Sequence, residues 1–145
     1  MNGMSKSLLT QIMLTHMNLP YIYGGKNPLL GLDCSGLVCC LLKSVHLLGT
    51  NEDLGSQELH DRFLPQSDLD VRDLGSLAFY GTDGVIDHVT MMLDSEFMIE
   101  AGHGTPQTLT RDIAAHRGAY TRVRHIDYRQ DFIKVFRPKY FATLT

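Results

Sequence analysis

Cys34 places a potentially nucleophilic side chain at the predicted start of a helix. Residues 32–38 read Leu-Asp-Cys-Ser-Gly-Leu-Val. Apolar residues then recur at helical spacing as far as Leu48, and Gly49 follows where such a helix would end. Asp33 is a suitable N-cap, which puts Cys34 in the first helical turn. The free backbone N–H groups and the positive end of the helix dipole favour a thiolate there, so the sequence predicts Cys34 to be a nucleophile.

The other two cysteines are interpreted as structural. Cys39 and Cys40 lie farther along the same predicted helix and are expected to be small apolar core residues. Three cysteines, two of them adjacent, do not make a disulfide framework. The chain also lacks a Cys-x-x-Cys pair and a His-x-x-x-His spacing, so we expect no metal site and no cofactor.

Helical patterns dominate the first half of the chain. Residues 5–17 place an apolar stripe on one face of an amphipathic helix, consisting of Leu8, Leu9, Ile12, Met13 and Met17. Pro20 ends that helix, because proline disfavours helical backbone in the residue before it. Residues 20–25 then suit a tight loop whose paired glycines approach either a ligand or the Cys34 helix. Residues 56–63 are expected to form a short helix.

Strand patterns dominate the second half. Short apolar runs bounded by Gly, Asp and Ser predict strands at residues 77–80, 85–93, 96–101, 121–126 and 132–136. Helices followed by strands favour an α+β fold in which N-terminal helices pack on an antiparallel β-sheet. No repeat, linker or low-complexity segment interrupts the sequence, so residues 1–145 are expected to form a single domain.

Composition and charge exclude several classes of protein. The chain is 43% hydrophobic and 20% charged, which is typical of a globular domain and not of a disordered one. Residues 111–145 are basic, but their basic residues alternate with apolar ones as on the solvated face of a strand, and we expect no nucleic-acid partner. The first residues contain no charged leader and no long apolar run. We therefore expect no signal peptide, no membrane span, and synthesis in the cytoplasm.

Three motifs in order resemble the NlpC/P60 cysteine peptidases, which are papain-like cell-wall hydrolases. They are Pro-Tyr-x-Tyr-Gly-Gly at residues 20–25, Asp-Cys-Ser-Gly-Leu-Val at residues 33–38 and Asp-His-Val at residues 87–89. The resemblance extends from about residue 20 to residue 138. It implies a papain-like NlpC/P60 fold with the nucleophile at a helix N-terminus. It also implies that Cys34 is the nucleophile and His88 the base.

The resemblance further implies a third polar residue that orients the imidazole, and two residues compete for that role. A three-residue turn at residues 94–96 would put His88 and Glu100 on the same face of a hairpin. His103 lies between two glycines where the strand has ended, and it stays an alternative because a loop histidine can reach a site out of strand register. Asp87 should point to the opposite face from His88, so we interpret it as structural.

The resemblance also implies a subsite for substrate. In the family, residues matching Tyr21, Asp33 and Ser35 bind the free amino end of a cell-wall stem peptide, and a carboxylate with two hydroxyls can satisfy the three donors of an ammonium group. Alternatively, Asp33 acts only as the N-cap of the helix and Ser35 only as a residue of its first turn. The capping role and the substrate-binding role can also coexist. Tyr21 is in addition a candidate to help the backbone N–H of Cys34 stabilise the oxyanion.

The function expected from these residues is a cysteine peptidase that acts on peptidoglycan or muropeptides, at the γ-D-glutamyl–diamino acid bond typical of the family. One alternative is an amidase or acyltransferase that uses Cys34 and His88 on a non-wall substrate. Another is an inactive structural module, such as a phage tail component. Without an export signal, the enzyme is expected either to act on imported wall fragments or to reach the wall through a phage tail, a lysis system or a secretion apparatus. Analogy favours a phage-tail or lysis-associated role.

Overall fold

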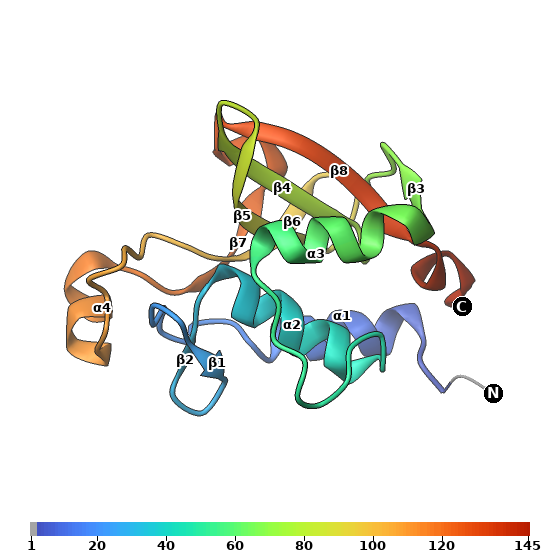
Figure 1. The fold of residues 1–145 in the computed structure, drawn as a ribbon. Coiled ribbons are helices and arrows are strands. Elements are labelled where there is room, and N and C mark those ends of the chain that lie inside the picture. The colour runs from blue at the N-terminus through green and yellow to red at the C-terminus, as the bar shows by residue number, and fades with distance from the viewer. Residues whose placement is uncertain (1–2) are drawn as a thin grey trace.

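The computed structural model describes residues 3–145 and shows helices packed against an antiparallel sheet (Figure 1). The helical layer contains α1 (Lys6–Leu14), α2 (Cys34–Ser44) and α3 (Ser56–Phe63). The strand order in the six-stranded sheet is β3-β8-β4-β5-β6-β7, and each neighbouring pair is antiparallel. The predicted α+β class, with N-terminal helices on an antiparallel sheet, is therefore confirmed.

The strands follow the predicted pattern closely. They are β3 (Ser67–Leu69), β4 (Leu77–Thr82), β5 (Val85–Met92), β6 (Phe97–Ala101), β7 (Thr121–His125) and β8 (Phe132–Pro138). All but β3 were predicted. The sequence patterns also missed a small hairpin of β1 (Lys26–Asn27) and β2 (Gly31–Leu32), and the helix α4 (Arg111–Arg117). These elements are too short to show a periodic apolar pattern. The 3-10 turns are η1 (Leu64–Gln66), η2 (Ile126–Tyr128) and η3 (Lys139–Thr143).

The helices begin where the capping residues predict but end earlier than the apolar pattern suggests. The Ser5 side chain caps α1 by accepting a hydrogen bond from the N–H of Leu8 at 3.1 Å. The chain then turns through Asn18, whose φ of 66° is left-handed. Likewise α2 stops before Gly49, and His46 adopts a left-handed φ of 64°. Within residues 3–145 no helix combines the length and the apolar character needed to cross a membrane.

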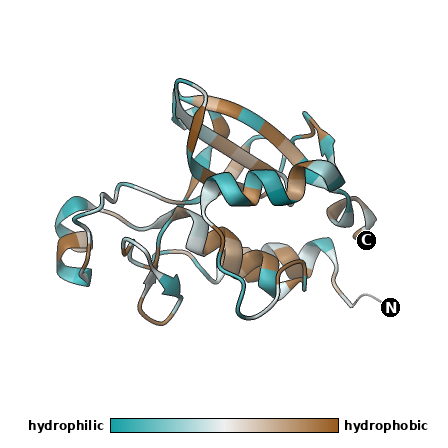
Figure 2. Cartoon of the chain, in the orientation of Figure 1, coloured by the Kyte–Doolittle hydropathy of each residue, from teal (hydrophilic) through white to brown (hydrophobic). Residues whose placement is uncertain are grey.

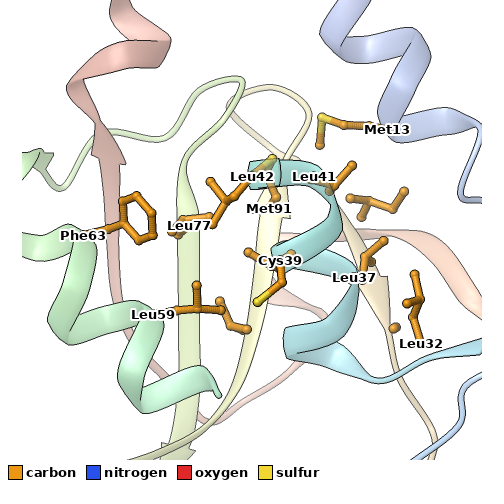
Figure 3. Packing of buried hydrophobic residues seen from close by; sticks show 14 of the residues in the cluster. Met13, Leu32, Leu37, Cys39, Leu41, Leu42, Leu59, Phe63, Leu77 and Met91 are labelled. Atoms are coloured by element: carbon orange, nitrogen blue, oxygen red, sulfur yellow. The ribbon is translucent and has the colours of Figure 1, made fainter. Parts of the chain in front are cut away.

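The main core lies between the helices and the sheet. Figure 3 shows α2 at its centre, with side chains from α1 and α3 and from strands β4 and β5 packed around it. The residues that make these contacts are fully or almost fully buried, and include Met13, Leu37, Leu41, Leu42, Leu59, Phe63, Leu77 and Met91. Hydropathy colours in Figure 2 show that α2 is mostly apolar, whereas α3 carries a hydrophilic face. Cys39 is 2% exposed in this core, as predicted.

A second apolar cluster covers the other face of the strands. It consists of Ala78, Tyr80, Met92, Met98, Ile126 and Val135. The Tyr80 hydroxyl donates a hydrogen bond to the carbonyl oxygen of Ile126 at 2.9 Å, so this buried phenol ties β4 to the chain after β7. Because side chains alternate along strands, His88 lies on the same face of β5 as Met92, and Glu100 on the same face of β6 as Met98.

Candidate active site

The N-terminus of α2 holds Cys34 at the edge of a cleft. Asp33 is the N-cap residue, as predicted, and its Oδ1 accepts a hydrogen bond from the N–H of Gly36 at 2.7 Å. Its Oδ2 accepts a second one from the N–H of Gly24 at 3.1 Å. A single carboxylate therefore caps the helix and also holds the paired-glycine loop against it. This arrangement fixes the backbone on both sides of Cys34.

Close backbone packing explains the glycine two residues after Cys34. A Cβ atom at Gly36 would overlap the carbonyl oxygen of Gly25. The paired-glycine loop was expected to approach either a ligand or the Cys34 helix, and it is the helix that it approaches. The N–H of Asp33 adds a hydrogen bond to the same carbonyl oxygen at 3.2 Å.

We expect Gly36→Ala to lower the free energy of unfolding by about 1–3 kcal/mol, because the added methyl group meets backbone that cannot rotate away. Urea unfolding followed by circular dichroism measures the change. Gly55→Ala is the matched control, since a Cβ there meets only the flexible carboxylate of Glu58 at 3.4 Å. Equal stability losses for the two variants would contradict the close-packing explanation.

A β-bulge in β5 sets the direction of the His88 side chain. Tyr80 of β4 pairs with His88, but the next residue of β4, Gly81, pairs with Ile86, so Asp87 is an extra residue in β5. Bulges bend a strand and redirect its side chains. His88 is 6% exposed, and its ring lies 5.7 Å from that of Tyr80 between centroids. Asp87 was interpreted as structural from strict alternation, but it is exposed and lines the cleft because the bulge breaks the alternation.

The β5–β6 hairpin brings His88 and Glu100 together. The N–H of Leu93 donates to the carbonyl oxygen of Phe97 at 2.8 Å, so the predicted three-residue turn is confirmed. In this register the His88 Nε2 atom lies 2.8 Å from the Glu100 Oε2 atom. Glu100 is only 3% exposed. Because Glu100 occupies Nε2, the other ring nitrogen, Nδ1, is left for the thiol of Cys34.

Electrostatics at this pair favour a charged imidazole. Burial by itself lowers the pKa of His88, but hydrogen bonds with Cys34 and Glu100 outweigh burial and raise the pKa to about 9. Burial raises the pKa of Glu100, whereas the hydrogen bond from His88 lowers it, and the net direction is downward. An imidazolium between a carboxylate and a sulfur atom can stabilise a thiolate and later donate a proton.

The raised pKa of His88 predicts a pH dependence of stability. Its value of about 9 in the folded protein exceeds the ordinary 6.5, so the folded state binds this proton more tightly than the unfolded state does. The resulting stabilisation is complete below about pH 6.5 and is lost as the pH rises through 9. We expect the free energy of unfolding, measured with urea from pH 6 to 10, to fall more steeply for the wild type than for His88→Gln. Parallel curves for the two proteins would contradict this assignment.

His103 makes a different set of contacts. Its Nε2 accepts hydrogen bonds from Arg124 Nη2 at 3.0 Å and from the Tyr128 hydroxyl at 2.9 Å. Partial burial and the nearby Arg124 lower the pKa of His103, so the neutral ring is favoured. His103 lines the cleft from a loop, with a left-handed φ of 64°. Within residues 3–145 no hydrogen bond joins it to His88, and Glu100 is the residue that contacts the imidazole.

Tyr21 closes the Cys34 side of the cleft. It is 9% exposed and lines the same cleft of about 370 Å³ as Cys34 and His88. Burial, and then the proximity of Cys34 and Asp33, raise the pKa of the Tyr21 phenol, so its hydroxyl stays protonated and can donate. The Ser35 hydroxyl donates to Asp33 Oδ1 at 3.4 Å. Asp33 and Ser35 thus flank Cys34 in sequence, although neither is among the residues that line the cleft.

Sequence reasoning missed Arg129, which also lines the cleft. Its Nε and Nη2 atoms donate to the two carboxylate oxygens of Asp131 at 2.9 and 2.6 Å. Its guanidinium also stands over the ring of Tyr80, 5.5 Å from the centroid. No local motif marks Arg129, because it belongs to the basic segment that was interpreted as a solvated strand face.

Comparisons with known proteins agree with the fold. The family described as NlpC/P60 matches residues 18–130. The NlpC/p60 domain of the peptidoglycan hydrolase SagA superposes with a TM-score of 0.63 at 19% identity, covering 91% of this chain and 97% of that one. The P60 domain of an antigen from M. avium subspecies paratuberculosis gives a TM-score of 0.62 at 22% identity, covering 91% and 93%.

Longer proteins contain the same fold as one part. An NlpC/P60 family protein from Bacillus cereus gives a TM-score of 0.67 at 20% identity, covering 93% of this chain but only 40% of that one. The peptidoglycan hydrolase RipB from Mycobacterium tuberculosis gives a TM-score of 0.59 at 20% identity, covering 91% and 65%. No curated protein sequence matches the chain.

Proposed function

The chain belongs to the NlpC/P60 family, and from this premise we propose that it is a cysteine peptidase that cleaves an amide bond in peptidoglycan stem peptides. The proposed target is the γ-D-glutamyl–diamino acid bond. The observation that carries the proposal is the juxtaposition of Cys34 and His88 in one cleft, with the buried Glu100 hydrogen-bonded to His88. Two structural relatives, SagA and RipB, are described as peptidoglycan hydrolases, which supports a cell-wall substrate.

The proposed mechanism is acyl transfer through a thioester. The thiolate of Cys34 attacks the scissile carbonyl carbon, and the oxyanion that forms accepts hydrogen bonds from the Cys34 N–H and the Tyr21 hydroxyl. His88 then donates its Nδ1 proton to the leaving amine, and the C–N bond breaks. In the second half, His88 takes a proton from water, which attacks the thioester and releases Cys34. Glu100 holds the imidazole in orientation throughout.

We propose that the free amino end of the stem peptide binds beside Cys34, at Tyr21, Asp33 and Ser35. Asp33 already accepts hydrogen bonds at both carboxylate oxygens, from Gly36 and from Gly24. A carboxylate offers about four lone-pair sites, so it can cap the helix and still accept from an ammonium group. This dual use would couple substrate binding to the backbone that positions the nucleophile.

The lining of the cleft favours a polar peptide substrate over the alternatives. An acyltransferase for lipids needs a deep apolar channel, whereas this cleft is lined by Tyr, His, Asp and Arg side chains together with a glycine-rich loop. A purely structural module would not need a buried His88–Glu100 pair beside Cys34. The phage-associated delivery route and the cytoplasmic synthesis stay predictions.

The decisive experiment is mass spectrometry of defined stem peptides, with the L-alanine amine either free or acetylated, after incubation with the protein. We expect a product that ends in D-glutamate, together with a new free amine on the diamino acid, and neither should form with Cys34→Ala. Acetylation of the L-alanine amine should suppress cleavage if the Tyr21–Asp33–Ser35 subsite is used. A folded, alkylatable protein that leaves all of these stem peptides intact would overturn the proposal.

A further inference from the structure

The cleft is lined by two chemically different groups of residues. Tyr21, with Tyr23 beside it, lies near Cys34, whereas Asp87 precedes His88 in β5 and Arg129 lies close enough to affect the charge of His88; we call these groups the Cys34 end and the His88 end of the cleft. In a cysteine peptidase the acyl part of the substrate is held at the nucleophile, and the histidine protonates the leaving amine. The His88 end of the cleft must therefore face the leaving group. In the proposed reaction that leaving group is the diamino acid.

Arg129 is held rigidly at this end. Asp131 takes one N–H from Nε and one from Nη2, which leaves three of the five guanidinium N–H groups. Within residues 3–145 no hydrogen bond engages Nη1, and the side chain is 31% exposed. The ring of Tyr80 supports the guanidinium from one side. A guanidinium that is fixed in place and keeps a free edge is suited to bind a carboxylate in two-point fashion.

Asp87 supplies a negative charge at the same end. It stands on the β5 bulge, is exposed, and lines the cleft together with Arg129. Within residues 3–145 Asp87 and Arg129 form no direct ion pair, so the Asp87 carboxylate and the edge of Arg129 that Asp131 does not occupy both remain open to a ligand. A cation and an anion side by side complement a group that carries a carboxylate and an ammonium on the same carbon atom.

We propose that Arg129 and Asp87 form a leaving-group subsite that selects a diamino acid whose far end is zwitterionic, such as diaminopimelate, over lysine. The inference rests on the proposed function. The carboxylate at the far end of diaminopimelate binds the free edge of Arg129, and its ammonium binds Asp87. At its far end lysine has only the ammonium, so the free edge of Arg129 gains no carboxylate partner there and the lysine peptide binds less tightly.

The test compares two tripeptides, L-Ala-γ-D-Glu-meso-diaminopimelate and L-Ala-γ-D-Glu-L-Lys, by their kcat/KM values. We expect the wild type to prefer the diaminopimelate peptide by about 10-fold or more, as one charge-assisted hydrogen-bonded contact provides. Arg129→Gln should reduce this ratio to near 1. Asp87→Asn should raise KM for both peptides, because both present an ammonium group. Arg72→Gln is the matched control and should keep the ratio, since that guanidinium lies 5.2 Å from the Phe132 ring and outside the cleft lining.

The outcomes separate this inference from the proposed function. If the wild type cleaves both tripeptides equally well, the subsite is wrong while the peptidase proposal stands. If a folded Arg129→Gln protein loses kcat/KM equally on both peptides, Arg129 has a structural role instead. Cleavage of neither tripeptide by wild-type protein would overturn the peptidase and the subsite together. Because the wild-type ratio is itself decisive, the test holds even if Arg129→Gln fails to fold.

Discussion

Replacement of Cys34 by alanine is expected to lower kcat/KM on a free-amine stem peptide by about 10⁴-fold or more. The thioester route disappears with the sulfur atom, and only the oxyanion donors and substrate binding remain to assist attack by water. Initial rates from chromatographic separation of the products measure the loss. Cys40→Ala is the matched control, because this half-buried cysteine lies on the same helix and should change the rate less than about twofold.

Alkylation supplies a second readout for the same prediction. Cys34 is partly exposed and lines the cleft, whereas Cys39 is 2% exposed and burial raises the pKa of its thiol to about 11. Iodoacetamide at neutral pH should therefore modify Cys34 first, as peptide mapping would show. Substantial turnover by a folded Cys34→Ala protein, or a Cys34 that resists alkylation while Cys39 reacts, would contradict its role as nucleophile.

Glu100→Ala is expected to lower kcat by about 10²–10⁴-fold with a much smaller change in KM, because the imidazole loses the partner that orients it. His103→Ala should lower kcat/KM by less than about tenfold, since His103 contacts Arg124 and Tyr128 and not His88. The steady-state kinetics of both variants give a direct comparison of the two candidates. A severe loss in His103→Ala with a mild one in Glu100→Ala would reverse the assignment.

The conservative variant Glu100→Gln distinguishes an orienting role from a structural one. The amide oxygen of glutamine can still accept a hydrogen bond from Nε2 and hold the ring, so part of the activity should return. The amide carries no charge, however, and the pKa of His88 should fall from about 9. We therefore expect the alkaline limb of the kcat profile to move to lower pH in Glu100→Gln. If the alkaline limb of the kcat profile stays at the same pH in Glu100→Gln, the charge of Glu100 does not raise the pKa of His88.

Local chemistry determined much of this protein from its sequence. The Asp33 N-cap fixed where α2 begins and therefore where Cys34 stands, because capping depends on residues adjacent in the chain. The three-residue turn between β5 and β6 set the register of a hairpin, and register alone brings Glu100 to His88. The helix at residues 56–63 and the longer strands were also predictable, because short apolar runs and helical spacing are visible within each segment.

Tertiary structure alone decided the remaining features of the cleft. The bulge that exposes Asp87 arises from pairing with β4, where a Cβ at Gly81 would overlap the carbonyl oxygen of Val85, and no pattern within β5 signals it. Arg129 reaches the cleft because β8 pairs with β4 while β4 pairs with β5, which brings residues far apart in the chain together. Spacing reveals contacts between neighbours in sequence, but a cleft lined by residues from a helix start, strands and several loops forms only when the sheet and its core assemble.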